Sequence, residues 1–199
     1  MGAWFERMAA VPGLAFAGSP GVVREAVPGW ADRPDESYGS PMWPTAEGST
    51  SATPASRHVP FDVGGADLIA RVWEALELPG SAMDYHFVLQ SAVERLWGAR
   101  RAEPEALAAL EVFALLDLDL MEAAPHAVSF KTAATAVKFV QVSSVPRLIA
   151  LLEREGAFGE ALAVARRLVR FGQGENVVVR LEEKARALVT EAAAQGGSA

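Results

Sequence analysis

The side chains that could take part in acid–base or metal chemistry are few in this sequence. It has 3 histidines, His58, His86 and His126, and none stands four positions from another, as two zinc ligands on one helix would. His86 lies between Tyr85 and Phe87, so a metal or a proton transfer here would need partners from distant parts of the chain. Because a lone histidine is a weak indicator of function, we interpret His86 as a side chain packed among aromatic residues near a helix start.

Three carboxylates stand near the end of an apolar, alanine-rich segment: Asp117, Asp119 and Glu122. Carboxylates are unfavourable near a helix C-terminus, so solvent, an arginine partner or a function must offset this cost. In a helix, Asp119 and Glu122 share a face while Asp117 points roughly the other way. A pair of carboxylates is the machinery of many hydrolases. A small hydrolase or accessory enzyme that uses these groups and His86 is therefore the alternative function. We expect instead a solvated or salt-bridged edge, because buried carboxylates are rare.

Other motifs that would identify an enzyme are missing. No GxSxG nucleophile motif occurs, and the glycine pairs lack the spacing and the lysine of a phosphate-binding loop. The sequence contains 0 cysteines, which excludes thiolate catalysis, disulfides and cysteine-ligated metals. We expect no catalytic residue, no metal and no cofactor.

The charge balance argues against nucleic acid as a partner. The net charge is −7, whereas nonspecific binding to nucleic acid needs clustered lysine and arginine that displace counterions. One cluster of arginines exists, Arg166, Arg167 and Arg170, and it makes a nucleic-acid accessory protein a third hypothesis. The C-terminal dipole of a helix accounts for these cations without a ligand, so we expect no nucleic-acid partner.

The composition indicates a globular, helical protein of the cytoplasm. Hydrophobic residues make up 51% and charged residues 22% of 199 positions, enough apolar side chains for a core. Alanine and leucine dominate, which favours helices. No segment reaches the about 18 consecutive apolar residues of a membrane span, and Glu6 and Pro12 interrupt the pattern of a secretion signal. We expect no membrane partner.

The sequence divides into three parts of different composition. Residues 1–60 are rich in Pro, Gly, Ser and Thr and predict an irregular N-terminal arm and linker, of which Gly48 to Ser56 is the most mobile part. The arm carries aromatic residues, Trp4, Phe5, Phe16, Trp30, Tyr38 and Trp43, so we expect part of it to lie across the helical body. Residues 61–194 predict a helical domain, and residues 195–199 predict a flexible tail.

Apolar side chains recur at helical spacing after Phe61. Leu68, Val72 and Leu76 mark a first helix that ends before Pro79. Ser81 or Asp84 can cap a second helix. A third begins near residue 104 and continues through "LLDLDL", although that stretch alternates like a strand, because alanine-rich flanks make it too long for a strand. Residues 127–142 are ambiguous: we expect a helix, with a strand pair as the alternative, because Val and Thr are stiff in helices.

Residues 143–174 form a helical hairpin with a distinctive turn. Ser143 or Ser144 can cap its first helix, Gly156 breaks the helix, and Phe158 follows two positions on. Ala161 and Ala165 then allow two helices to approach closely. This pattern resembles a single tetratricopeptide (TPR) repeat. Val145 departs from the family pattern, which often has Trp at this position, and Ile149 stands where the family often has a small residue. A last helix from about Asn176, the candidate cap, presents a polar outer face.

The resemblance implies an all-α fold of stacked antiparallel helical hairpins, as a TPR-like bundle or short solenoid with an irregular N-terminal arm. It also implies a groove along the first helix of each hairpin. We expect cations at such a groove to bind an acidic peptide: Lys131, Lys138, Arg147 and Arg154. The leading hypothesis is a non-enzymatic scaffold that binds another protein, a peptide or its own copy. The arm itself could instead fill the groove.

Overall fold

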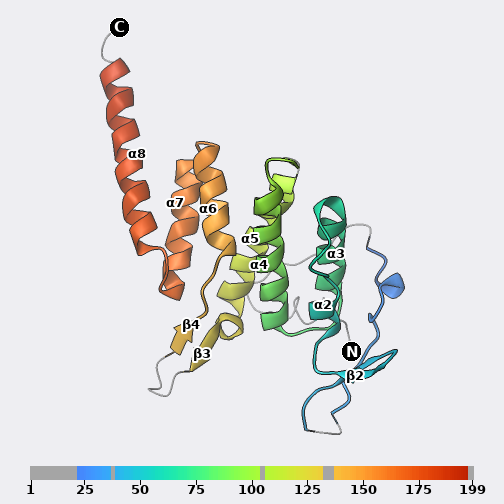
Figure 1. Cartoon of the computed structure of the whole chain (residues 1–199). Helices are drawn as coiled ribbons and strands as arrows, with labels where there is room; N and C mark the ends of the chain where they lie inside the picture. Colours follow the sequence, from blue (N-terminus) through green and yellow to red (C-terminus); the bar gives the residue numbers. More distant parts are fainter. Residues whose placement is uncertain (1–21, 37–38, 104–105, 132–136, 197–199) are drawn as a thin grey trace. The chain divides into compact units, whose positions relative to one another are not determined.

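The computed structural model describes residues 22–36, 39–103, 106–131 and 137–196. These residues are mostly helical, with seven α-helices and two short β-hairpins among them (Figure 1). The all-α class is therefore confirmed in its coarse form. The chain divides into two compact units, residues 1–140 and 141–199, and each is described by itself.

The first unit contains four helices and both hairpins. Its helices are α2 (Pro54–Arg57), α3 (Gly65–Glu77), α4 (Ala82–Ala99) and α5 (Ala106–Ala123). Its strands are β1 (Trp43–Thr45), β2 (Gly48–Thr50), β3 (Ser129–Lys131) and β4 (Val137–Phe139). Two 3₁₀ turns are η1 (Arg24–Ala26) and η2 (Pro125–Val128).

Helices α4 and α5 pack against each other more extensively than any other pair of described elements. Leu89 and Leu96 of α4 and Leu110, Phe113 and Leu118 of α5 are fully or almost fully buried. Burial of each such side chain stabilises the fold by about 1.5–3 kcal/mol. The strand-like alternation of "LLDLDL" has no effect on the outcome, since tertiary burial on several sides of α5 favours a helix that is apolar almost all round.

The predicted stripe of α3 faces α4. Leu68, Val72 and Leu76 are buried, as the spacing predicts. At the start of α4, the Ser81 hydroxyl accepts a hydrogen bond from the backbone N–H of Asp84 at 3.2 Å. The Asp84 carboxylate accepts one from the backbone N–H of Ser81 at 2.8 Å. Both capping candidates thus act together and satisfy two backbone donors that a helix start leaves unpaired.

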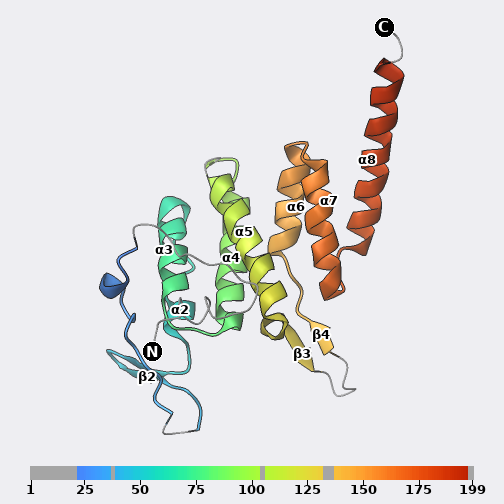
Figure 2. The same cartoon turned by 180° about the vertical axis from the view of Figure 1, so that it is seen from behind.

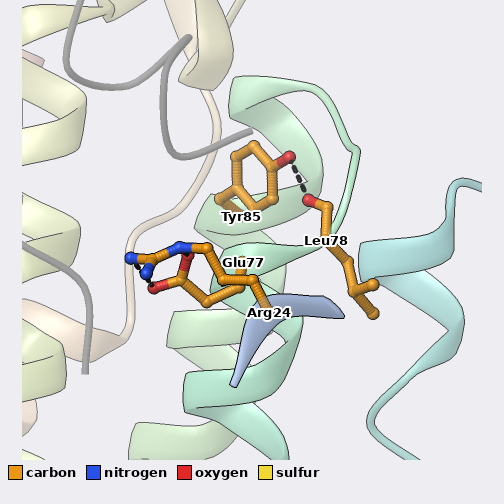
Figure 3. Close-up of polar contacts among 4 residues, drawn as sticks. All are labelled: Arg24, Glu77, Leu78 and Tyr85. Atoms are coloured by element: carbon orange, nitrogen blue, oxygen red, sulfur yellow. Dashed lines mark hydrogen bonds and ion pairs between the residues drawn. The ribbon is translucent and has the colours of Figure 1, made fainter. Parts of the chain in front are cut away.

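Parts of the N-terminal region are attached to α3 by specific contacts. The guanidinium of Arg24 donates to both carboxylate oxygens of Glu77, at 2.7 and 3.2 Å (Figure 3). The side chain of Glu77 is fully buried, and a buried carboxylate requires such a partner. Val27 and Trp43 are also buried.

Much of the predicted arm therefore has defined structure, including β2 and α2 within the segment expected to be most mobile. Residues 1–21, with Trp4, Phe5 and Phe16, lie outside the described part of the chain, as does Tyr38.

The turn between α3 and α4 is packed too tightly for a side chain at Gly80. The hydroxyl of Tyr85 donates to the carbonyl oxygen of Leu78 at 2.7 Å (Figure 3), and the N–H of Ala55 donates to the carbonyl of Pro79 at 3.1 Å. These two bonds hold the Tyr85 ring and α2 on either side of Gly80. A Cβ atom at Gly80 would lie 2.8 Å from the Tyr85 ring and 2.9 Å from Cβ of Ala55.

The ambiguous segment after α5 forms strands. β3 pairs with β4 in antiparallel register, with Ser129 opposite Phe139 and Lys131 opposite Val137. The helix expected over residues 127–142 is therefore wrong, and the alternative strand pair is confirmed. Residues 132–136 lie outside the described part. β-Branched Val137 is accommodated in a strand, where its χ1 angle is less restricted than in a helix.

The second unit is the helical hairpin followed by a long helix. It contains α6 (Ser144–Arg154), α7 (Phe158–Leu168), the 3₁₀ turn η3 (Val169–Phe171) and α8 (Glu175–Gly196). Figure 2 shows α6 and α7 side by side, with α8 against α7. Gly156 adopts a φ of 78°, a left-handed conformation that permits the tight turn. Ala161 and Ala165 are fully buried, which allows the close approach of the helices.

The last helix begins and ends at different residues from those predicted. α8 starts at Glu175, so Asn176 lies in its first turn and is not its cap. The helix continues to Gly196, which includes the first residues of the predicted tail. Within the described part of the chain, no helix combines the length and apolar character needed to cross a membrane.

We predict that Gly80→Ala destabilises the first unit by about 1–3 kcal/mol, the typical cost of overpacking. Urea unfolding followed by tryptophan fluorescence measures this directly, because all 5 tryptophans of the chain lie within residues 1–140. The control is Gly98→Ala in α4, where a Cβ atom meets nothing within 4 Å and alanine should stabilise the helix by up to about 1 kcal/mol. Equal effects of the two substitutions would contradict the packing of Gly80.

Candidate functional site

A histidine of α4 and a carboxylate of α5 form a hydrogen bond inside the first unit. Nδ1 of His86 lies 2.7 Å from Oδ1 of Asp117, and both side chains are 0% exposed. An isolated carboxylate is very costly to bury, and the hydrogen bond to the imidazole offsets part of that cost for Asp117. Asp117 therefore does not lie on the expected solvated or salt-bridged edge, because its side chain is fully buried. Its partner is a histidine 31 positions earlier in the sequence.

The second ring nitrogen of His86 has no hydrogen-bond partner among the described residues. The bond to Asp117 occupies Nδ1, so Nε2 is left as a buried nitrogen without a hydrogen bond to any described residue. The ring centroid of Phe87 lies 5.0 Å from that of His86, as expected for a histidine among aromatic residues.

The four residues of the hydrolase alternative do not converge. Asp119 follows Asp117 by two positions, a rotation of about 200° around a helix of 3.6 residues per turn. Asp119 and Glu122 are partly exposed, whereas His86 and Asp117 are closed to solvent. No substrate can reach the buried pair in this conformation, so we interpret it as a structural contact between α4 and α5.

The second unit contains an open hollow of about 300 Å³ beside α6 and the start of α8, which we call the α6–α8 hollow. Its lining comes from both helices, the end of α7 and the preceding loops: Gln141, Val142, Pro146, Ile149, Ala150, Glu153, Leu168, Gln173, Gly174, Asn176, Val177 and Arg180. The four α6 residues stand at i, i+3, i+4 and i+7, which places them on one face of that helix.

An ion pair joins the two helices at the wall of the hollow. Arg180 of α8 donates to both carboxylate oxygens of Glu153, at 2.5 and 2.8 Å. The hydrogen bond from Arg180 lowers the pKa of Glu153, against the opposing effect of burial. The same bond raises the pKa of Arg180. Near the other end, the Gln173 side chain accepts a hydrogen bond from the N–H of Val142 at 3.1 Å and so fixes that part of the wall.

The predicted peptide-binding cations lie elsewhere. Arg147 is half-buried and Arg154 is exposed, and both follow by one position a residue of the lining face of α6. Lys138 is exposed on β4, and Lys131 ends β3, with its side chain outside the described part. The two lysines belong to the first unit and the two arginines to the second.

The lining pair Glu153 and Arg180 was missed by the sequence reasoning, since 27 positions separate them and no motif links them. Among the clustered arginines, Arg166 donates to Glu182 of α8 at 2.8 Å. This arginine therefore contributes to the packing of α7 with α8.

Comparisons with protein-family models, with curated proteins and with solved structures gave no match. What each feature can do therefore has to follow from its geometry. The His86–Asp117 pair is sealed in the core. The α6–α8 hollow is open and is lined by both apolar and hydrogen-bonding side chains, so it is the better candidate for binding.

We predict that Asp117→Ala destabilises the first unit by at least about 2 kcal/mol, because it leaves a buried imidazole without its partner. The double replacement His86→Phe with Asp117→Leu removes both polar groups and should recover much of that loss. Tryptophan-monitored urea unfolding measures both. Asp119→Ala, at a partly exposed position of the same helix, is the matched control. If Asp119→Ala lowers the free energy of unfolding as much as Asp117→Ala, the His86–Asp117 bond does not contribute specifically to stability.

We predict that Arg180→Gln raises the pKa of Glu153 toward its ordinary value of 4.5. Since the carboxylate has a lowered pKa in the folded protein, its contribution to stability is present above pH 4.5 and is lost as the pH falls through the folded pKa. The destabilising effect of Arg180→Gln should therefore shrink in acid.

Carbon-13 NMR of the Glu153 carboxyl, with hydrogen exchange of α6 and α8 at several pH values, tests this prediction. Arg186→Gln is the control, because Arg186 donates to the carbonyl oxygen of Glu182. An unchanged titration of Glu153 in Arg180→Gln would contradict the role of the ion pair.

Proposed function

We propose that this protein is a non-enzymatic interaction scaffold whose second unit acts as a TPR-like module and binds a peptide segment of another protein in the α6–α8 hollow. The observation that carries the proposal is the hollow itself. It is open, it lies along the first helix of the hairpin, and residues of two helices meet in it.

The local structure of the hairpin supports the TPR-like part of the proposal. The support consists of the left-handed turn at Gly156, the start of α7 at Phe158 and the buried side chains of Ala161 and Ala165. In such hairpins the first helix borders the groove. α6 is that helix here, and α8 follows α7 in the place of the next first helix.

The chemistry of the lining fits a peptide better than a cofactor. The apolar part of the lining consists largely of Val142, Pro146, Ile149 and Val177, which can contact an apolar side chain of a partner. Asn176 and the backbone of the nearby loop can bond the amide groups of an extended segment, which is how grooves commonly hold peptides. A volume of about 300 Å³ is at the small end for ligand pockets.

The charges near the hollow favour an acidic partner. Arg154 is exposed two turns beyond Arg147 on the stripe next to the lining face. Within the lining, Arg180 is occupied by Glu153. Cations beside an apolar groove attract and orient acidic segments, mainly through the rate of association.

We predict that Ala150→Trp fills the hollow and abolishes partner binding, whereas Ala163→Trp on the exposed face of α7 leaves it intact. Proteins that co-purify with the full chain are quantified for the native chain and both variants. Circular dichroism checks that the variants fold. The double variant Arg147→Glu, Arg154→Glu should lose acidic partners selectively.

The same set of partners retained by all variants would reject the hollow as the binding site. Light scattering of the native chain and of Ala150→Trp shows whether the occupant is a second copy. If the native chain is a dimer and Ala150→Trp is a monomer, the occupant of the hollow is a second copy of the chain and not a peptide of another protein.

A further inference from the structure

A hollow of about 410 Å³ lies in the first unit, where the arm meets α2. We call it the arm hollow. Three separate segments line it: Pro28, Gly29 and Asp32; then Pro44, Thr45 and Ala46; then Pro54, Arg57 and His58. Each segment contributes a proline, whose fixed φ angle limits how far these walls can move. The volume is within the range of small-molecule sites.

His58 is held in the wall by α3. Its side chain is only 8% exposed, and Nε2 lies 2.6 Å from a carboxylate oxygen of Glu74. Arg71 lies 3.7 Å from the same oxygen and 3.4 Å from Nε2 of His58. The Nε2 side of the imidazole is therefore engaged by two side chains of α3, which leaves Nδ1 as the ring nitrogen available to a ligand. No hydrogen bond to Nδ1 is made by the described residues.

Two opposite charges line the same hollow without neutralising each other. Asp32 is partly buried and Arg57 is exposed, and neither makes a side-chain hydrogen bond or ion pair with any described residue. An unpaired carboxylate that is partly withdrawn from water gains from a cation, and the guanidinium fork matches a carboxylate in two-point geometry.

We propose that the arm hollow binds a small zwitterion of the amino-acid class. The ligand carboxylate pairs with Arg57, its ammonium group pairs with Asp32, and Nδ1 of His58 offers a further hydrogen-bonding position to the ligand. The prolines and Ala46 face the ligand side chain. The site belongs to the first unit and is independent of peptide binding by the second.

The test uses the full-length protein and the standard free amino acids as probes, first by thermal shift and then by calorimetry. We expect saturable binding of at least one of them with a dissociation constant below about 1 mM. The amide of that amino acid, which lacks the carboxylate, and its N-acetyl form, which lacks the ammonium group, should each bind at least about tenfold more weakly. Saturation should also shift the imidazole resonances of His58 and leave those of the exposed His126 unchanged.

Substitutions separate the two ends of the ligand. Arg57→Gln and Asp32→Asn should each weaken binding at least about tenfold, whereas Arg101→Gln, at an exposed position outside the lining, should have no effect. Absence of saturable binding by every amino acid would overturn the proposal. It would also fail if the N-acetyl form bound as well as the parent compound, which would indicate a simple anion site, or if affinity survived both Arg57→Gln and Asp32→Asn.

Discussion

The packing of α4 against α5 is the contact on which the rest of the first unit depends. Its apolar side chains supply the free energy, while the buried His86–Asp117 bond constrains how the helices meet. Any rotation of α4 that separated these two groups would leave an imidazole and a carboxylate buried without each other. Leucines alone tolerate such rotations far better, because hydrophobic contact has no direction. The pair therefore adds specificity to a core whose stability comes from apolar burial.

Specific side-chain contacts also hold the N-terminal arm in place. The elements described between residue 22 and α3 are only three or four residues long, so this part of the chain depends on particular side chains. Arg24 compensates the buried charge of Glu77, and Trp43 gives the β1–β2 hairpin a buried side chain. Around Gly80, the absence of a side chain lets α2 approach the α3–α4 turn. The arm hollow results from these attachments, since its three lining segments meet only because each is held separately.

In the second unit, the α6–α8 hollow is formed by the packing of three helices. A turn glycine and two buried alanines bring α6 and α7 together, and α8 then continues beyond the hairpin, with 22 residues against the 11 of α7. Because α8 is the longer helix, Leu188 and Val189 near its far end are not covered and are 43% and 71% exposed. The Glu153–Arg180 pair fixes the opposite end of α8 against α6, so the hollow has one wall on each helix.

Local pattern in the sequence was enough to determine the helices: the stripe of α3, the Ser81–Asp84 cap and the hairpin around Gly156 all form where periodicity and turn chemistry place them. These signals act within a few residues, so they are readable one segment at a time. The strand pair after α5, the burial of Asp117, the Glu153–Arg180 pair and both hollows were decided only by tertiary structure. Apart from the strand pair, each brings together groups that lie far apart in the sequence, such as the histidine and its carboxylate, which are 31 positions apart. The packing of whole elements determines which distant side chains come into contact. The spacing of residues within one segment does not predict that packing.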